Sequence, residues 1–292
     1  MKAVAHHRFG GPEVLEVVDL PDPKVNLDSV LVRVKAAGVN PADLGMRSGA
    51  LADVVDTYFP VVPGWDIAGV VERPGPAAPE FAVGDEVVGY VRSEVQHRHG
   101  GYAEKVAADV RTLVHKPKSL SWAEAAALPV AGLTAYQAVV NALRIGPDES
   151  LLVLGAAGGV GSLAAQIATA RDARVFGTAS PHDHDYLRSL GVEPVTSVTG
   201  PVDAVLDAAG GGALADVPNG PRVASVAEFT RPGVIPVFLR LDQADFRALV
   251  DLADTGRLSV RVGRTLPLTE AAEAHRLVAA GGTRGKVVLS VD

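Results

Sequence analysis

The sequence predicts an α/β protein made of a β-rich part and a parallel sheet flanked by helices. Short strands separated by turns fill the first third of the chain, and strands and helices alternate from residue 151 to about residue 256. A glycine cluster also connects the first strand of that series to a helix. At 292 residues, the chain is long enough to bury a large core in one or two domains.

The β-rich part consists of short apolar segments between turns that come about every ten residues. This spacing is typical of a barrel-like fold rather than of βαβ units. Strands are expected at residues 3–4, 15–19, 29–37, 67–72 and 83–89, the last of which begins with a turn.

The character of the sequence changes at Ser121. Helices are expected at 122–128 and 134–143, each opened by a Ser or Thr cap. Strands are then expected at 151–154, 173–178, 202–208, 222–227 and 234–239. The chain ends with helices at 242–255 and 269–279 and a strand at 286–291, which could rejoin the β-rich part. The first of these two helices has one apolar face, made by Phe246, Leu249, Val250 and Ala253.

The most informative segment is Leu151–Gly161, an apolar run that leads into a glycine cluster. A buried strand that turns tightly into a helix leaves free backbone N–H groups at the helix start. Together with the helix dipole, these groups can bind a pyrophosphate. Ala156 stands where the usual G-x-G-x-x-G pattern has its first glycine, and Gly158 and Gly161 fill the other two positions. A plain tight turn is the alternative interpretation.

Composition excludes several classes of function. The formal net charge of −7, with basic residues scattered along the chain, argues against nucleic-acid binding. The chain has no cysteine, which excludes disulfides, thiolate zinc sites and a cysteine nucleophile. No apolar run reaches membrane-spanning length and no signal region opens the sequence, so we expect a cytoplasmic protein.

Seven motifs follow one another along the chain: 38–43 with 47–49, 63–71, 81–87, 100–104, 126–129 with 132–136, 156–161 and 284–288. In this order they resemble the medium-chain dehydrogenase/reductase superfamily, specifically its zinc-free quinone oxidoreductase (zeta-crystallin-like) branch. The resemblance implies a β-rich GroES-like substrate domain at 1–118 and 260–292, and a Rossmann NADP-binding domain at 119–259. It also implies a homodimer.

The zinc ligands of related enzymes have no counterpart here. Those relatives place a cysteine in the first loop, a His-Glu pair in the second segment and a further cysteine before the coenzyme domain. The matching positions are near Asn40, at Trp65 and Asp66, and near Val130. One carboxylate cannot supply three protein ligands, so we expect no metal. The close pairs His97/His99 and His182/His184 are interpreted as solvated loop residues.

Two further departures from the family bear on function. Gly45 stands where some quinone reductases have a tyrosine, so the proton donor is left open. The segment between Gly210 and Ser225 is shorter than in relatives, which implies that the Rossmann part is trimmed on one edge.

The strand expected at 173–178 carries no acid at its tip, where an NAD-binding protein places the partner of the ribose 2′-hydroxyl. Ser180 can donate a hydrogen bond to a 2′-phosphate and His182 can add positive charge. Asp183 and Asp185 oppose this if they point inward. We therefore predict NADPH as the cofactor, while Ser180 as a mere helix cap is the alternative.

The resemblance implies a set of site residues. Asn40 would lie close to the nicotinamide and the substrate and act in catalysis, although a plain Asn-Pro turn is the alternative. For Lys286, a surface position is as compatible with the sequence as a cofactor contact. The remaining cofactor-binding candidates are Thr134, Ala157, Gly158, Gly159, Val160, Thr178, Ser180, Ala208, Gly210, Phe238, Leu239 and Arg284.

The predicted function is an NADPH-dependent, zinc-independent reductase of small quinones or α,β-unsaturated carbonyls. A conjugated acceptor spreads the negative charge that hydride transfer creates, so it needs a metal less than a simple ketone does. Two alternatives stay open: a biosynthetic enzyme of this fold with cyclising or isomerising chemistry, and a binding protein that holds NADPH without turnover.

Overall fold

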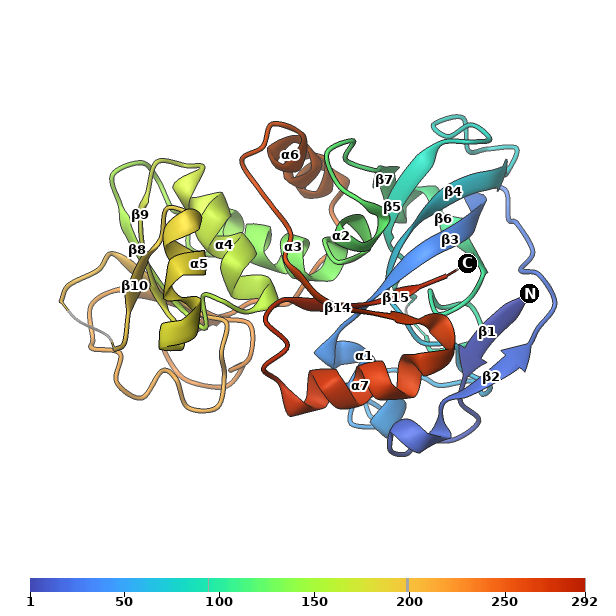
Figure 1. Ribbon diagram of the computed structural model, residues 1–292, viewed down its shortest axis with the longest axis horizontal. Coiled ribbons are helices and arrows are strands. Elements are labelled where there is room, and N and C mark those ends of the chain that lie inside the picture. Colours follow the sequence, from blue (N-terminus) through green and yellow to red (C-terminus); the bar gives the residue numbers. More distant parts are fainter. Residues whose placement is uncertain (94, 198–199, 292) are drawn as a thin grey trace. The chain divides into compact units, whose positions relative to one another are not determined.

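The computed structural model describes residues 1–93, 95–197 and 200–291. The chain divides into two compact units, shown in Figure 1. The first, here called the β-rich unit, comprises Met1–Val130 and Val260–Asp292, and the second, the α/β unit, comprises Ala131–Ser259. Within the described part of the chain, no helix has the length and apolar character needed to cross a membrane.

The unit boundary falls after Val130, later in the chain than the sequence placed it. The reason is helix α2 (Trp122–Ala126), which packs on strands β3 and β4 of the β-rich unit. A Cβ atom at Gly38 would lie only 2.4 Å from the Ala126 carbonyl oxygen, so glycine permits this close approach. Ser121 caps α2 as predicted.

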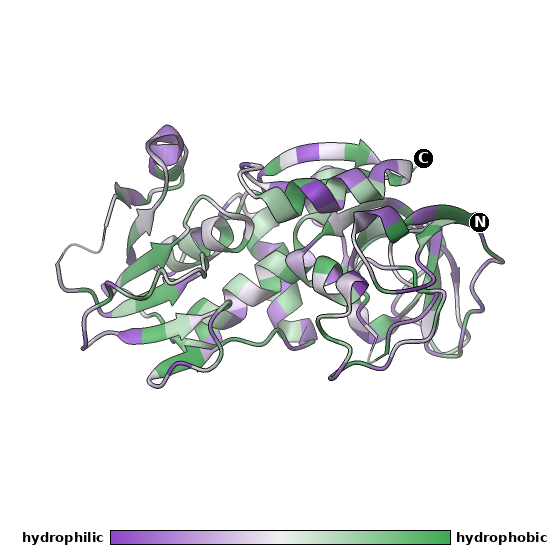
Figure 2. Cartoon of the chain, turned by 90° about the horizontal axis from the view of Figure 1, so that it is seen from below, coloured by the Kyte–Doolittle hydropathy of each residue, from purple (hydrophilic) through white to green (hydrophobic). Residues whose placement is uncertain are grey.

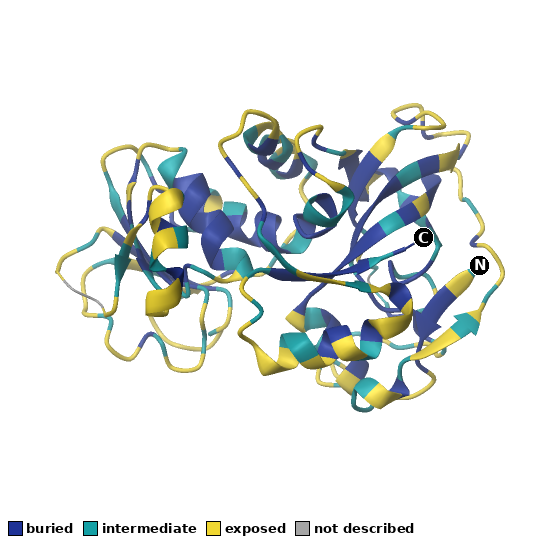
Figure 3. Ribbon diagram, viewed as in Figure 1, coloured by how far each residue is buried: buried dark blue, intermediate teal, exposed yellow. Residues whose placement is uncertain are grey.

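The β-rich unit is built on a seven-stranded sheet in the order β14-β15-β3-β4-β5-β7, with β6 also paired to β3. The strands are β3 (Ser29–Val39), β4 (Asp66–Pro74), β5 (Glu86–Tyr90), β6 (Lys105–Asp109), β7 (Leu113–His115), β14 (Val262–Pro267) and β15 (Lys286–Ser290). The last strand does rejoin this unit, because β15 pairs antiparallel with β3. Buried Val, Leu and Ala side chains fill the core. Figure 3 colours the buried residues of these strands dark blue.

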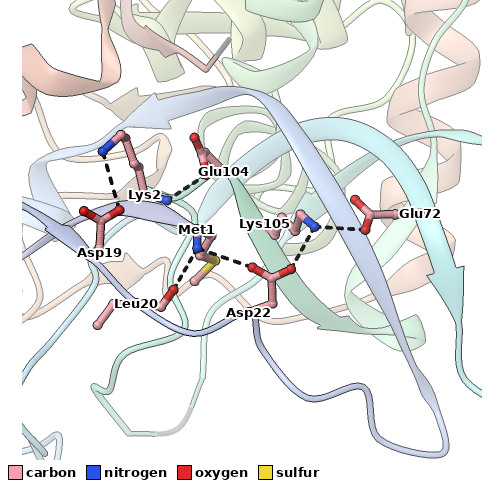
Figure 4. A network of polar contacts seen from close by, with 8 residues as sticks. All are labelled: Met1, Lys2, Asp19, Leu20, Asp22, Glu72, Glu104 and Lys105. Atoms are coloured by element: carbon pink, nitrogen blue, oxygen red, sulfur yellow. Dashed lines mark hydrogen bonds and ion pairs between the residues drawn. The ribbon is translucent and has the colours of Figure 1, made fainter.

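A two-stranded sheet of β1 (Lys2–Ala5) and β2 (Glu16–Asp19) is tied to this unit by the network in Figure 4. The N-terminal ammonium donates to the Leu20 carbonyl at 2.7 Å, and the Lys2 amide donates to Glu104 at 2.7 Å. Lys105 bridges Asp22 and Glu72 at 2.8 and 3.0 Å. These partly exposed ion pairs add little stability individually, so they serve mainly to fix the position of the strand.

Two helices pack together in the β-rich unit, α1 (Pro41–Ser48) and α7 (Ala271–Ala280), and both are visible in Figure 1. The sequence predicts no helix at residues 41–48, so α1 is a finding of the structure. Pro41 opens α1, Asp43 accepts a hydrogen bond from the Asn40 amide, and Gly49 ends the helix at φ +86°. Helix α7 follows a 3-10 turn at Leu268–Glu270.

The α/β unit contains a six-stranded parallel sheet in the order β10-β9-β8-β11-β12-β13. This is the 3-2-1-4-5-6 order of the doubly wound dinucleotide-binding fold, and Figure 2 shows its strands as largely apolar. The strands are β8 (Ser150–Leu154), β9 (Arg174–Thr178), β10 (Glu193–Val195), β11 (Ala204–Asp207), β12 (Arg222–Ser225) and β13 (Val234–Pro236).

The helices of this part are α3 (Pro129–Tyr136), the π-helical η3 (Gln137–Ala142), α4 (Gly159–Thr169), α5 (His184–Ser189) and α6 (Gln243–Asp254). Asp242 caps α6, and its predicted inner face is buried at Phe246, Leu249 and Ala253. The expected Thr cap at residue 134 is wrong. The helix begins at Pro129, so Thr134 lies inside it.

The trimmed edge that the sequence predicted is present. No helix joins β11 to β12 or β12 to β13 in the described residues, and turns occupy residues 211–216. Leu214 from this segment packs instead against Leu152, Leu154 and Val205 and closes part of the sheet surface. A short loop therefore covers a face that a helix would cover more fully, and Val223 and Val234 stay only partly buried.

Candidate active site

The glycine loop of the α/β unit forms a tight turn between β8 and α4. Gly155 has φ +74°, so the glycine that this turn requires stands one residue before Ala156. A Cβ at Gly161 would lie 2.2 Å from the Gly155 carbonyl oxygen, which makes glycine obligatory there as well. Ala156, at the first position of the pattern, is not among the residues with positive φ, so the backbone tolerates an alanine there.

The start of α4 presents free amides. Gly158 is the N-cap and makes no side-chain cap, and the first bond of the helix runs from the Ser162 amide to the Gly158 carbonyl at 3.0 Å. The amides of Gly159, Val160 and Gly161 precede that bond and have no acceptor within the helix. An array of such donors at a helix N-terminus fits a phosphate or pyrophosphate group.

Neighbouring strand ends hold the loop in place. The Gly155 amide donates to Thr178 Oγ1 at 3.0 Å, and the Ala156 amide donates to the Thr178 carbonyl at 2.9 Å. The Ala208 amide donates to the Leu154 carbonyl at 3.0 Å. The structure therefore brings the predicted residues Thr178 and Ala208 together with the glycine loop at the carboxyl ends of β8, β9 and β11.

Asp207 was missed by the sequence analysis. Its buried carboxylate accepts from the Ala209 and Gly210 amides at 3.0 and 2.9 Å and from Ser225 Oγ at 2.7 Å. It thereby fixes the backbone around Gly210, a predicted site residue with φ +67°. The available signal was an acid at the end of an apolar strand, just before a run of small residues.

The two residues directly after β9, Ala179 and Ser180, carry no carboxylate. Ser180 is exposed and its hydroxyl makes no cap to the 3-10 turn at Pro181–Asp183, so the capping alternative is wrong. His182 Nε2 lies 3.2 Å from the carboxylate of Asp183, which is largely buried. When His182 is protonated, this carboxylate compensates the positive charge of the imidazole. Asp185 is fully exposed and pairs with Arg188 at 2.7 Å.

Other predicted cofactor residues have varied surroundings. Thr134 is buried inside α3, whereas Phe238 is exposed and stacks on Phe229 with ring centroids 4.7 Å apart. Leu239 is half-buried, and Arg284 is exposed at the turn before β15. The binding roles of these residues, and those of Ala157 and Gly158, stay predictions.

Asn40 belongs to a buried polar cluster in the β-rich unit. Lys286 Nζ donates to Asn40 Oδ1 and, at 3.1 Å, to the Val39 carbonyl. Asn40 Nδ2 donates to Asp66 Oδ2 at 2.9 Å, and the Val130 amide donates to Asp66 Oδ1 at 2.9 Å. The surface interpretation of Lys286 is therefore wrong, because the side chain is buried and anchors the Asn40 amide.

The cluster continues through Asp43. Its Oδ2 accepts from the Asn40 amide at 2.8 Å and from the Tyr102 hydroxyl at 3.4 Å, and Tyr102 in turn contacts His275 Nε2 at 3.2 Å. Arg47 approaches the other ring nitrogen of His275 at 3.5 Å. Because arginine only donates, we assign the ring proton to Nε2, which then donates to the Tyr102 oxygen.

Burial governs the pKa values in this cluster. It raises the pKa of Asp43 to about 7 and that of Asp66 to about 6, against opposing attraction to Lys286. Burial also lowers the pKa of Lys286, and it lowers that of His275 to about 3, which keeps the imidazole neutral. Two carboxyl groups beside one ammonium can thus hold a proton near neutral pH.

The residues at the matching zinc positions do not fit a zinc ion. Asn40, Trp65, Asp66 and Val130 offer one carboxylate, and both of its oxygens already accept hydrogen bonds from the protein. Among the residues described, no group of three His, Asp or Glu side chains is placed to bind a metal.

Comparisons with known proteins agree with this fold and loop. Residues 26–118 match the alcohol dehydrogenase GroES-like domain, and residues 182–289 match a family described as zinc-binding dehydrogenase. The chain is 31% identical to the chloroplastic NADPH-dependent alkenal/one oxidoreductase of Arabidopsis thaliana, over 99% of this chain and 79% of the relative.

Two solved structures are similar over the whole chain. The quinone oxidoreductase from Coxiella burnetii has a TM-score of 0.87 and 30% identity, with 100% of this chain and 99% of that chain covered. An NAD-dependent alcohol dehydrogenase has a TM-score of 0.88 and 35% identity, with both chains fully covered. The fold and the loop define an oxidoreductase of the dehydrogenase class. The chain belongs to the medium-chain dehydrogenase/reductase superfamily, in its quinone oxidoreductase branch.

Proposed function

We propose that this protein is an NADPH-dependent reductase of quinones or α,β-unsaturated carbonyls. The observation that carries the proposal is the turn at Gly155–Gly161, which leaves the amides of Gly159, Val160 and Gly161 free at the carboxyl end of β8. The chain continues from β8 to β9 on one side, and β11 pairs with β8 on the other, so the loop lies at the switch point where open α/β sheets bind ligands.

NADPH, when bound, supplies a hydride. The chain's own residues would hold the pyrophosphate on the α4 amides, with Thr178 and Asp207 keeping the neighbouring loops in position. The 2′-phosphate is accommodated because no carboxylate stands at the tip of β9 and the Ser180 hydroxyl is exposed. The solved NAD-dependent relative makes NADH the necessary competitor in any binding test.

The acceptor class follows from the absence of a zinc ligand set at Asn40, Trp65 and Asp66 in the sequence. Charge that develops on the acceptor oxygen must then be stabilised by hydrogen bonds or by conjugation within the acceptor itself. Quinones and enones provide that conjugation. Asn40 keeps one amide N–H beyond its bond to Asp66, so it can serve as a donor.

The direct test is NADPH oxidation with a panel of quinones, enones and simple ketones, followed by absorbance. We expect turnover with the first two groups and with NADPH in preference to NADH. Tight NADPH binding without turnover on any acceptor supports the binding-protein alternative, while conversion of a substrate without net NADPH loss supports cyclising or isomerising chemistry.

A single substitution tests the phosphate loop. Gly159→Asp places a carboxylate among the α4 amides and should abolish NADPH binding, measured by calorimetry, with the circular dichroism spectrum unchanged. Gly146→Ala is a suitable control, because its Cβ would lie 3.6 Å from the nearest atom, a Glu149 carboxylate oxygen. Unchanged affinity in Gly159→Asp shows that the loop is wrongly assigned.

We also propose a homodimer formed through β13. This strand is the last of its sheet, and Ile235 on it is exposed together with Phe229, Phe238 and Leu241 nearby in sequence. A second copy paired along the same edge would cover the free backbone groups and these side chains. Light scattering of the wild type and of Ile235→Lys tests this: the variant should be monomeric.

A further inference from the structure

A small cavity with both polar and apolar walls lies within the β-rich unit, with a volume of about 30 Å³. Asp43 from α1 forms part of its wall, and the loop that follows β5 contributes Gln96, His97 and His99. The other walls are mostly apolar and include Met46, Val61, Val62, Pro63, Trp65 and Val91. The proposed cofactor loop uses none of these residues.

Four atoms of the lining side chains are buried without a hydrogen-bond partner among the residues described. They are Asp43 Oδ1, Gln96 Oε1, His97 Nδ1 and His99 Nδ1. Asp43 is 1% exposed and Gln96 is 6% exposed, and Gln96 is held in place by its bond to Thr57 Oγ1 at 3.1 Å. Burying a polar atom without a hydrogen-bond partner is unfavourable, so this set indicates a bound polar ligand.

The size and chemistry of the cavity select the ligand. One water occupies about 10–15 Å³ on this measure, so the space accepts about two water molecules and excludes a quinone ring. The described side chains offer no metal-binding group of three. Carboxyl, amide and imidazole groups around one small space are instead the partners that ordered water needs.

The groups around this water can exchange protons. The His97 and His99 rings lie 5.0 Å apart, and burial lowers the pKa of both, which favours the neutral ring with one donor and one acceptor nitrogen. In the cavity wall formed by α1, burial raises the pKa of Asp43 to about 7. The charged or titratable groups packed around Asp43 are Asp66 on β4, Lys286 on β15, Tyr102 before β6, His275 on α7 and Arg47 on α1.

We propose that water in this cavity links the Asp43 carboxyl to His97 and His99, and that Asp43 is the proton source for enone reduction. The inference rests on the proposed function. Hydride addition to the β-carbon moves the C=C electrons onto the carbonyl as an enolate. The Asp43 O–H bond then breaks, its electron pair stays on the carboxylate, and the proton passes through water to the α-carbon of the enolate, where a new C–H bond forms. His97 and His99 return a proton from solvent to Asp43.

Comparing an enone with a quinone as the acceptor shows whether Asp43 supplies a proton or only supports the structure. Asp43→Asn should lower kcat for an enone by about 100-fold, in the range of general acid catalysis. For a benzoquinone the loss of kcat should be at least about tenfold smaller than for the enone, because the hydroquinone anion is stable without a proton. Equal losses with both acceptors would overturn the proposal, since a misplaced helix α1 affects both alike.

The loop histidines test the supply of protons. His97→Asn combined with His99→Asn should lower enone kcat by about tenfold, again with quinone turnover largely kept. His115→Asn is the matched control: this exposed histidine of the same unit pairs with Asp85 at 3.3 Å and should behave as wild type. A double variant with wild-type enone turnover contradicts the proposal.

A measurement without turnover keeps the test independent of the proposed function. Infrared spectra between pH 5 and 9 should show a protonated carboxyl band that Asp43→Asn removes, and its exchange in D₂O should slow in the His97/His99 double variant. If Asp43→Asn fails to fold, Gln96→Leu should slow the same exchange. A wild type that turns over neither acceptor overturns the proposed function and the proton supply with it. Unchanged exchange in the variants overturns the water link alone.

Discussion

Lys286 and Asn40 show how the role of a side chain depends on partners far away in sequence. The resemblance offered Lys286 as a cofactor contact and Asn40 as a catalytic residue. In the structure, the Lys286 ammonium donates hydrogen bonds to Asn40 Oδ1 and to the Val39 carbonyl. One N–H of the Asn40 side-chain amide donates to Asp66. The amide is therefore oriented by two buried charges, and its remaining N–H has a fixed direction.

Asp43 should make stability depend on pH. Its pKa of about 7 in the folded chain lies above the ordinary 3.8, so the folded chain holds a proton that the unfolded chain releases. The stability from this group is complete below about pH 4 and is lost as the pH rises through 7.

Asp43→Asn removes that dependence. Relative to wild type, the variant should gain stability between pH 5 and pH 8, on the order of 2 kcal/mol. Chemical denaturation at the two pH values measures the difference. Parallel pH profiles for the two proteins would show that Asp43 is ionised throughout.

At the scale of elements, the β8–α4 turn depends on backbone approach as much as on side chains. Gly155 takes a left-handed conformation, and Gly161 lies against the Gly155 carbonyl. The sequence placed this turn correctly, because an apolar run, small residues and a helical period occur together. It could not show that Thr178 holds the Gly155 amide of this turn or that Asp207 holds the loop around Gly210. Such hydrogen bonds depend on the positions that the strand ends take in the folded sheet.

Gly161→Ala tests the packing of this turn. The added methyl would meet the Gly155 carbonyl oxygen at 2.2 Å, so the loop must shift. We expect a loss of about 1–3 kcal/mol in stability and at least a tenfold weaker NADPH affinity. Urea denaturation and calorimetry measure the two effects, and Gly146→Ala again serves as the control. A variant with wild-type affinity indicates that the amides are not the binding groups.

At the scale of the whole molecule, the β-rich unit is assembled from both ends of the chain. Strand β15 lies between β14 and β3, and its residues Val287, Val288 and Leu289 are buried. Residues 1–130 alone would leave the end of β3 at residues 36–39 without its β15 partner and part of the core open.

Residues 1–130 alone should therefore fail to unfold cooperatively. The same residues joined to 260–292 by a Gly/Ser linker should give a cooperative thermal transition, followed by circular dichroism. A cooperative transition for 1–130 alone would show that β15 is dispensable.

The sequence by itself determined the two kinds of sheet and the glycine turn, while the family resemblance implied the trimmed edge and the return of the last strand. These features rest on local periodicity, turn chemistry and order along the chain, all of which can be read without contacts. Only the tertiary structure decided the helix at 41–48, the buried Asn40–Asp66–Lys286 cluster and the cavity beside Asp43. Each of these depends on burial that brings distant residues together, and burial alone changes which groups are charged and which still need a partner.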